Sequence, residues 1–245
     1  MKLYGLIGRP LKHSFSKKYF TEKFNREGIH DCRYENFELP AIEQLPTILN
    51  THTNLHGLNV TIPYKKEVIA FLDYKNEIVE AVGACNCIKI ENGELHGYNT
   101  DVIGFKKSLQ PFLKPHHQKA LVLGTGGSSG AVQYALQQLG IRYMLVSRQV
   151  RENAITYSQL DETILKEHTV IINTTPVGMF PNMEAAPELP YQFLTSQHVL
   201  FDLIYNPEKT LFLQKGEARG ATTANGYAML LLQAEESWRI WNSEA

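Results

Sequence analysis

The sequence has few cysteines and no excess of charge of either sign. Three cysteines in 245 residues, Cys32, Cys85 and Cys87, are too few and too unevenly spaced for a disulfide framework or a four-ligand zinc site. We interpret them as buried free thiols. The 24 Lys and Arg residues nearly balance the 25 Asp and Glu residues, which gives a net charge of −1. This balance argues against a nucleic-acid-binding protein, which usually needs a basic field.

Long apolar runs are also lacking. No stretch approaches the roughly 20 apolar residues that span a bilayer, and the start MKLYGLIGRP has no apolar segment typical of a signal peptide. We therefore expect a cytoplasmic protein. His52 and His56 are four residues apart but have no third ligand nearby, so we expect no metal site. We interpret His13 as structural, with a supporting role beside the serines that follow it as the alternative.

Strand-like and helix-like segments alternate along the whole chain, which predicts an α/β fold with parallel sheets. The expected strands are 2–7, 33–37, 58–62, 85–90, 119–123, 143–147, 169–173 and 199–203. The expected helices are 16–27, 42–50, 77–82, 128–139 and 227–241. Asn92-Gly93 between two strand-like runs predicts a tight hairpin. The polar, proline-containing tract 110–117 is interpreted as a linker region between the two halves.

A glycine turn follows the strand 119–123 and precedes a helix. The turn reads Gly124-Thr125-Gly126-Gly127-Ser128-Ser129-Gly130, in the order strand, turn, helix that holds a pyrophosphate on backbone N–H groups. A structural turn is the alternative. Ser129 stands where the usual pattern has its third glycine, so close packing there would depend on a small residue.

The next strand ends at Ser147-Arg148, where NAD-specific folds place a carboxylate on the ribose. An arginine in that position suits a 2′-phosphate, because its planar fork makes paired bonds to phosphate oxygens. The sequence therefore favours NADP over NAD. Arg151 is interpreted either as a second phosphate contact or as a solvated surface charge.

Polar residues interrupt segments of the first half that should be apolar. Asn59 and Thr61 share one face of a strand, and Lys65-Lys66 follows its end, where ligands of open α/β sheets bind. The residues alone do not distinguish Lys65 from Lys66. Four further candidates are ambiguous when each is taken alone: Ser14, Ser16, Asn86 and Asp101. For Ser16 and Asp101 the structural alternative is a helix cap. Together these side chains suit a small polyhydroxylated acid.

Seven ordered segments resemble the shikimate dehydrogenase family, and the resemblance covers essentially the whole chain. The segments are His13–Ser16, Gly57–Lys65, Gly83–Asn86, Asn99–Gly104, Asn173–Met179, Asp202–Pro207 and Gly226–Ala234. The resemblance implies an enzyme that uses NADPH to reduce 3-dehydroshikimate to shikimate in aromatic amino acid biosynthesis. It also implies residues 1–100 as the substrate-binding catalytic domain and 101–225 as a Rossmann-type NADP-binding domain, with 226–245 returning to the first domain.

The resemblance also assigns site residues in this chain. Lys65 and Asp101 would be the catalytic pair, and Asp101 could instead orient a substrate hydroxyl. The implied substrate-binding residues are Ser14, Ser16, Asn59, Thr61, Asn86, Tyr205 and Gln233. The implied cofactor-binding residues are Gly124, Gly126, Gly127, Ser128, Ser147, Arg148, Thr174, Met179 and Gly226. Two positions depart from the family: Gln149 replaces the usual Thr or Ser, and Gly130 replaces a frequent Arg or Lys.

Three other functions compete with this interpretation. The nearest is a quinate/shikimate dehydrogenase with relaxed choice of substrate or cofactor. A silent sensor that binds shikimate or NADP is disfavoured, because a binding module needs no proton-transfer pair such as Lys65 and Asp101. A structural nucleotide-binding protein would leave the polar residues of the first half unexplained. We expect only small-molecule ligands and a monomer or homodimer.

Overall fold

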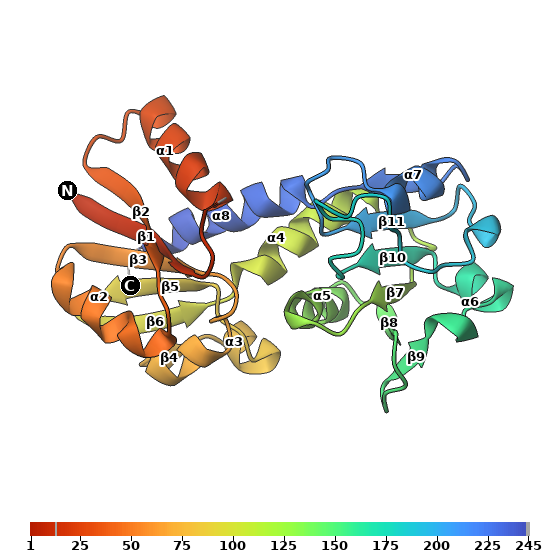
Figure 1. Ribbon diagram of the computed structural model, residues 1–245, viewed down its shortest axis with the longest axis horizontal. Coiled ribbons are helices and arrows are strands. Elements are labelled where there is room, and N and C mark those ends of the chain that lie inside the picture. The colour runs from red at the N-terminus through yellow and green to blue at the C-terminus, as the bar shows by residue number, and fades with distance from the viewer. Residues whose placement is uncertain (13, 244–245) are drawn as a thin grey trace. The chain divides into compact units, whose positions relative to one another are not determined.

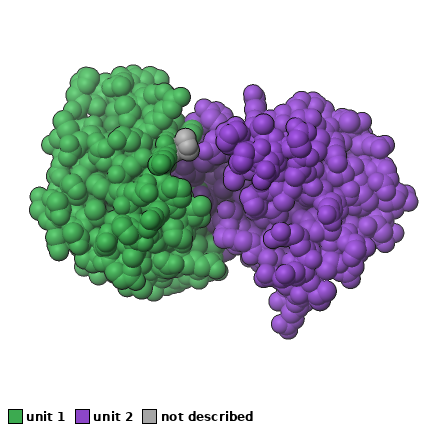
Figure 2. Space-filling model, in the orientation of Figure 1, with its two compact units in different colours: residues 1–100, 234–245 green, residues 101–233 purple. Residues whose placement is uncertain are grey.

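The alternating segments fold into two units, each with its own sheet and apolar core. The structure is a computed structural model that describes residues 1–12 and 14–243. Unit 1 contains Met1–Thr100 and the stretch that begins at Ala234, and unit 2 contains Asp101–Gln233 (Figure 2). Among the described residues, no helix has the length and apolar character needed to cross a bilayer.

The polar tract 110–117 does not separate the two units, because it lies inside unit 2. Gln110–Phe112 forms a 3₁₀ turn, and His117 is buried, with its Nε2 3.0 Å from the carbonyl oxygen of Gln197. The prediction of a linker there was wrong. Proline and polar composition correctly indicate irregular backbone, but they do not show that a side chain anchors it.

Unit 1 is built on a six-stranded sheet in the order β2-β1-β3-β5-β6-β4 (Figure 1). The strands are β1 (Lys2–Gly8), β2 (Cys32–Glu38), β3 (Leu55–Val60), β4 (Tyr74–Lys75), β5 (Cys87–Glu91) and β6 (Glu94–Tyr98). Strands β2, β1 and β3 are parallel, but β5 is antiparallel to both β3 and β6. The expectation of a parallel sheet therefore fails for this half of unit 1.

The antiparallel pair β5–β6 follows from its two-residue turn. Asn92 has φ 54° and Gly93 has φ 84°, the left-handed conformations that a tight hairpin requires at both central positions. The hairpin predicted at Asn92-Gly93 is present, and it reverses the strand direction within the sheet.

Both faces of strand β1 are buried. Tyr4 and Leu6 pack in one apolar cluster with residues of α1 (Phe15–Glu27) and α8 (Tyr227–Trp241). Leu3 and Ile7 point the other way, into a second cluster on the far side of the sheet. Two further helices of unit 1 are α2 (Leu45–Thr51) and α3 (Glu77–Val82).

Helix α1 begins and ends at recognisable caps. The Ser14 hydroxyl accepts a hydrogen bond from the Lys17 N–H, and Gly28 ends the helix with φ 66°. Ser14 is therefore the N-cap residue, and Ser16 lies in the first turn.

The C-terminal part of α8 belongs to unit 1. Its Trp241 stacks on Tyr4 with ring centroids 4.9 Å apart, and the indole N–H donates to the carbonyl oxygen of Ile88 at 2.9 Å. Gly57 is required beneath it, because a Cβ there would lie 2.4 Å from the indole. The helix therefore returns to unit 1 only from Ala234 on, whereas its residues up to Gln233 belong to unit 2.

Unit 2 is a parallel six-stranded sheet in the order β12-β11-β10-β7-β8-β9, the order of a Rossmann-type fold. The strands are β7 (Lys119–Leu123), β8 (Arg142–Ser147), β9 (Ala154–Thr156), β10 (Val170–Asn173), β11 (Val199–Asp202) and β12 (Thr222–Ala224). The helices are α4 (Thr100–Leu109), whose first residue is in unit 1, α5 (Gly127–Gln138), α6 (Glu162–Glu167) and α7 (Leu211–Glu217). The predicted α/β class with a Rossmann-type domain is confirmed.

Candidate active site

Lys65 lies in a turn that follows β3. The turn is fixed at Tyr64, whose N–H donates to the Thr61 carbonyl oxygen at 3.0 Å and whose buried phenol donates to the Leu39 carbonyl oxygen at 2.6 Å. Lys65 is half-buried, whereas Lys66 is exposed. The Lys65 carbonyl oxygen accepts from the Cys85 N–H at 2.7 Å, which ties the turn to the segment that contains Asn86. A half-buried ammonium group beside polar strand residues is better placed for chemistry than the exposed neighbour.

Asn86 is buried and its amide caps the start of α4. Its Oδ1 accepts from the Thr100 N–H at 2.6 Å, and its Nδ2 donates to the Thr100 hydroxyl at 3.0 Å. This contact fixes the first turn of α4, in which Asp101 is the second residue. Asp101 itself is half-buried and belongs to unit 2.

Asn59 is also buried, and it is held from three sides. Its Nδ2 donates to the Ser237 hydroxyl at 2.9 Å and faces the Asn86 carbonyl oxygen at 3.3 Å, and its Oδ1 accepts from the Tyr34 phenol at 2.8 Å. Its whole amide is engaged within unit 1. The other strand residue, Thr61, is half-buried, and its methyl group lies 2.3 Å from where a Cβ on Gly8 would stand.

Tyr34 connects Asn59 with Ser16, the second serine of the segment His13–Ser16. The Ser16 hydroxyl hydrogen-bonds to the phenol, and Phe20 stacks on the ring at 4.7 Å. Burial raises the pKa of Tyr34 well above its usual value, and the bond from Ser16 opposes this only in part. Ser14 and Ser16 are both half-buried, and His13 lies outside the described residues.

The sequence analysis did not identify Tyr34, Thr100 or Ser237. Tyr34 is a typical strand aromatic, and Ser237 is a small polar residue within an amphipathic helix. Their roles depend on contacts between segments up to 178 residues apart, as between Asn59 and Ser237. No local pattern in the sequence indicates such contacts.

In unit 2 the glycine turn has the shape that a phosphate group requires. Gly124 has φ 102° and lies against Thr174 and Thr175, so a side chain there would be strained and would clash. Gly126 and Gly127 instead face open space, with no atom within 4 Å of where a Cβ would stand. Gly126 is the N-cap of α5 and provides no side-chain cap, so the first N–H groups of the helix point into that space.

Ser129, the small residue at the third position of the turn, is closely packed, as expected. It is buried, and its hydroxyl donates to the Gly124 carbonyl oxygen at 3.0 Å. Thr174 supports the turn from β10, because its hydroxyl donates to the Leu123 carbonyl oxygen at 2.7 Å. Ser128 is exposed on the first turn of α5.

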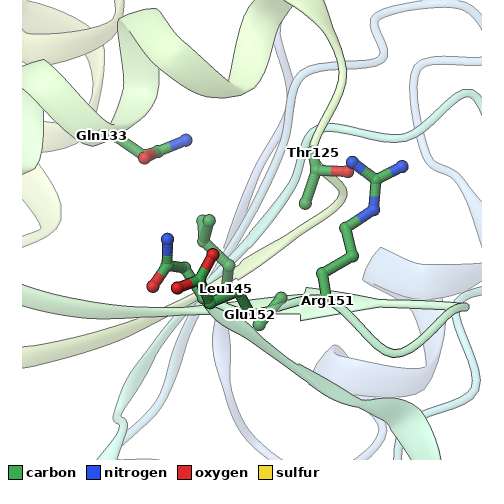
Figure 3. A pocket seen from close by; sticks show the side chains of 7 residues that line it. Thr125, Gln133, Leu145, Arg151 and Glu152 are labelled. Carbon is green, nitrogen blue, oxygen red and sulfur yellow. The ribbon is translucent and has the colours of Figure 1, made fainter.

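A cavity of about 500 Å³ opens beside the glycine turn (Figure 3). It is lined by Thr125, Gln133, Leu145, Arg151, Glu152, Asn153 and Ala154. The guanidinium group of Arg151 lies close to Thr125 in Figure 3. Arg148 is exposed at the end of β8, and Ser147 is buried with its hydroxyl accepting from the Gln149 N–H at 3.3 Å.

The remaining candidates of unit 2 lie on its loops and on α8. Met179 is 47% exposed and Tyr205 is 39% exposed, whereas Gln233 is buried and its Nε2 donates to the Leu230 carbonyl oxygen at 3.0 Å. Gly226 is required by packing, because a Cβ there would lie 2.1 Å from the Leu203 carbonyl oxygen.

A buried carboxyl group that the sequence analysis missed lies at the end of β11. Asp202 accepts from the Thr210 hydroxyl at 2.6 Å, from Asn173 Nδ2 at 3.0 Å and from the Ile204 N–H at 3.1 Å. Burial raises the pKa of Asp202 to about 6 despite these three bonds. The described residues include no group of three His, Cys, Asp or Glu side chains that could hold a metal ion.

Comparison with known proteins gives one consistent result. The family model described as the shikimate dehydrogenase substrate binding domain matches residues 6–88. A curated relative from Caldicellulosiruptor saccharolyticus, named shikimate dehydrogenase (NADP(+)), is 37% identical over an alignment of 257 positions that covers 98% of this chain and 91% of the relative.

Two solved structures extend this similarity to the whole fold. Shikimate 5-dehydrogenase from Thermus thermophilus, in complex with NADP(H) and shikimate, superposes with a TM-score of 0.86 and 29% identity, covering 99% of this chain and 94% of that one. Quinate dehydrogenase from Corynebacterium glutamicum, in complex with NAD, gives a TM-score of 0.87 and 27% identity, covering 98% and 93%. The resemblance noted in the sequence motifs is confirmed, and the chain belongs to the shikimate dehydrogenase family.

Proposed function

We propose that the chain is an NADP-dependent shikimate dehydrogenase that reversibly reduces 3-dehydroshikimate to shikimate. The observation that supports this most strongly is the similarity to relatives named shikimate dehydrogenase (NADP(+)) over 98% of the chain. Residues 1–100 with 226–245 are proposed as the substrate-binding catalytic domain, and 101–225 as the NADP-binding domain. The enzyme is proposed to act in the cytoplasm as a monomer or homodimer.

NADP fits the glycine turn of unit 2. Gly126 and Gly127 leave open space at the N-terminus of α5, where phosphate oxygens would accept from backbone N–H groups. Arg148 would hold the ribose 2′-phosphate, and Ser128, Ser147 and Thr174 would line the same end of the sheet. Met179 and Gly226 are proposed beside the nicotinamide. When bound, NADPH supplies a hydride to the carbonyl carbon of the substrate.

In this proposal Lys65 provides the proton. As the hydride reaches the carbonyl carbon, negative charge develops on the carbonyl oxygen, and a nearby ammonium group stabilises that charge and then protonates the oxygen. Lys65 becomes neutral and regains its proton from solvent. In the reverse direction neutral Lys65 removes the hydroxyl proton. Asp101 is proposed to assist this transfer or to orient the substrate hydroxyl.

The other side chains are proposed to recognise the substrate. Ser14, Ser16, Thr61 and Asn86 supply hydroxyl and amide groups for the carboxylate and hydroxyls of a small polyhydroxylated acid. Tyr205 and Gln233 are proposed as further substrate contacts.

Identification of the product tests the proposed reaction. Purified protein is incubated with 3-dehydroshikimate and NADPH, and the product is separated and compared with authentic shikimate. We expect one shikimate formed for each NADPH oxidised. NADPH oxidation without shikimate, or no reaction at all, would contradict the proposed function. Light scattering that shows an assembly larger than a dimer would contradict the proposed oligomeric state.

Relaxed specificity is a second candidate, because the TM-score of 0.87 to quinate dehydrogenase in complex with NAD is close to the 0.86 to the Thermus thermophilus shikimate enzyme. Arg148 favours NADP over NAD, since the ribose of NAD has no 2′-phosphate for a guanidinium group to bind. Parallel assays with quinate and NAD⁺ distinguish the two candidates.

A further inference from the structure

A continuous set of hydrogen bonds in unit 1 links two of the proposed substrate-binding residues, Ser16 and Asn86. The links run from Ser16 to Tyr34, to Asn59, to Ser237, to Thr100 and to Asn86. The last five of these residues are all less than 9% exposed. We call this set the buried polar chain.

Asn59 has no N–H group left to donate to a ligand. Each of its two N–H groups faces a protein acceptor, Ser237 Oγ at 2.9 Å and the Asn86 carbonyl oxygen at 3.3 Å. Its oxygen accepts from Tyr34 at 2.8 Å. A further donation to substrate would break one of these buried bonds and leave a buried group unsatisfied.

Asn86 differs, because its amide is only partly engaged. The atom 2.6 Å from the Thr100 N–H must be the amide oxygen, since a backbone N–H can only donate. This fixes the orientation of the amide. One of its N–H groups is directed to Thr100 Oγ1 at 3.0 Å, and within residues 1–12 and 14–243 no protein acceptor faces the other.

Ser237 joins the two asparagines. Its hydroxyl accepts from Asn59 and lies 3.3 Å from the hydroxyl of Thr100, the residue that holds the Asn86 amide. Ser237 is fully buried on α8, so this helix contributes a hydroxyl group to the centre of unit 1.

We propose that Asn59, Ser237 and Tyr34 are positioning residues, which orient the Asn86 amide and the Ser16 hydroxyl toward the substrate without contacting it. The inference rests on the proposed function, because it takes Asn86 and Ser16 as substrate-binding residues. It changes the role of Asn59 from a substrate contact to a support for other contacts.

Two substitutions test this role by removing one hydroxyl each. Ser237→Ala and Tyr34→Phe should each raise the KM for shikimate by about three- to tenfold, the effect of one hydrogen bond. The kcat and the KM for NADP⁺ should stay within about twofold, because the lost interaction concerns substrate binding. The double variant should show less than the product of the single effects, since both act on Asn59.

Ser108→Ala and Tyr191→Phe are the matched controls. Ser108 is buried and bonds only within its helix, to the Phe105 carbonyl oxygen at 2.9 Å, and Tyr191 donates to the Pro187 carbonyl oxygen at 2.8 Å. A substitution that only destabilises the fold lowers the amount of active enzyme and leaves KM unchanged. The controls should therefore leave both Michaelis constants unaltered.

The outcomes separate the inference from the proposed function. Wild-type turnover of shikimate is measured first, and its absence would overturn the proposed function and this inference with it. Normal wild-type turnover with an unchanged shikimate KM in Tyr34→Phe would overturn the inference alone. If Ser237→Ala does not fold, Tyr34→Phe, which removes a single oxygen from a stacked ring, still decides the question.

Discussion

At the scale of single residues, the account depends most on Lys65. The sequence leaves Lys65 and Lys66 equivalent, and only the family resemblance favours the first. The structure distinguishes them by burial, because Lys65 is half-buried and held by the bond from Cys85, whereas Lys66 faces solvent. The choice between adjacent lysines depends on how the turn after β3 packs, which no periodicity shows.

Replacement of Lys65 by Ala should lower kcat by about a hundred- to ten-thousandfold, the usual contribution of a general acid–base group. The KM for shikimate should change only a few-fold, because proton transfer matters mainly in the transition state. Steady-state kinetics with shikimate and NADP⁺ measure both constants. Lys66→Ala is the matched control and should retain wild-type kcat within about twofold. A large rise in KM with normal kcat in Lys65→Ala would contradict the proton-transfer role.

Asp202 gives a prediction about stability and pH. Burial raises its pKa from 3.8 to about 6, so between these values the folded state keeps a proton that the unfolded state releases. The contribution of Asp202 to the free energy of unfolding is greatest below about pH 4. It falls as the pH rises to about 6 and is then constant. The shift corresponds to about 3 kcal/mol.

Urea unfolding at several pH values tests this with Asp202→Asn, which cannot ionise. The free energy of unfolding of the wild type, relative to the variant, should fall by about 3 kcal/mol between pH 3 and pH 7. A difference that does not change with pH would show that the Asp202 carboxyl titrates alike in both states.

At the scale of elements, the glycine turn before α5 combines a folding requirement with the proposed cofactor-binding requirement. Gly124 needs its positive φ and has threonine atoms close by, whereas Gly127 stands in open space at the start of the helix. The sequence shows the glycines as one pattern. The structure separates those required by the backbone from those that leave room for a ligand.

Gly127→Ala should therefore have opposite effects on stability and cofactor binding. Alanine favours the helix, so the free energy of unfolding should stay equal or rise by up to about 1 kcal/mol. The KM for NADP⁺ should rise roughly tenfold or more, because the methyl group occupies space where a phosphate approaches the backbone. Denaturant unfolding and steady-state kinetics measure the two effects.

Gly124→Ala is the contrasting variant. It should lower the free energy of unfolding by at least about 1 kcal/mol, because alanine is strained at the positive φ of this position. Unchanged NADP⁺ kinetics in Gly127→Ala would show that the N-terminus of α5 does not hold the cofactor.

Secondary structure was predictable for the three longest helices, whereas the ten-residue helix α4 was not among the predicted helices. Helices α1, α5 and α8 lie within one residue of their predicted ranges. The strands β9 and β12 were missed because each has three residues, too few for alternation to be recognised. Sheet direction in unit 1 was predicted only in part, because the Asn-Gly turn shows a hairpin but not that β5 also runs antiparallel to β3.

At the scale of the whole molecule, the order of motifs along the chain was more informative than any single residue. The motifs predicted the family, the Rossmann-type sheet and the return of α8 to unit 1. The buried polar chain was not predictable, because it brings together residues from β2, β3, α4 and α8 through tertiary contacts alone. Asn59 illustrates what the sequence does not show. Its motif indicates a functional residue, but its proposed positioning role depends on its hydrogen bonds to three neighbours, which only the structure gives.

The most direct test of the central claim is one kinetic comparison on the wild-type protein. Oxidation of shikimate and of quinate is followed through the absorbance of the reduced nicotinamide, with NADP⁺ and with NAD⁺. The account predicts the highest kcat/KM for shikimate with NADP⁺, at least about tenfold above every other pair, as expected when one phosphate or substrate contact is lost. Equal values for quinate or NAD⁺ would contradict the proposed specificity, and binding of shikimate without turnover would contradict the enzyme itself.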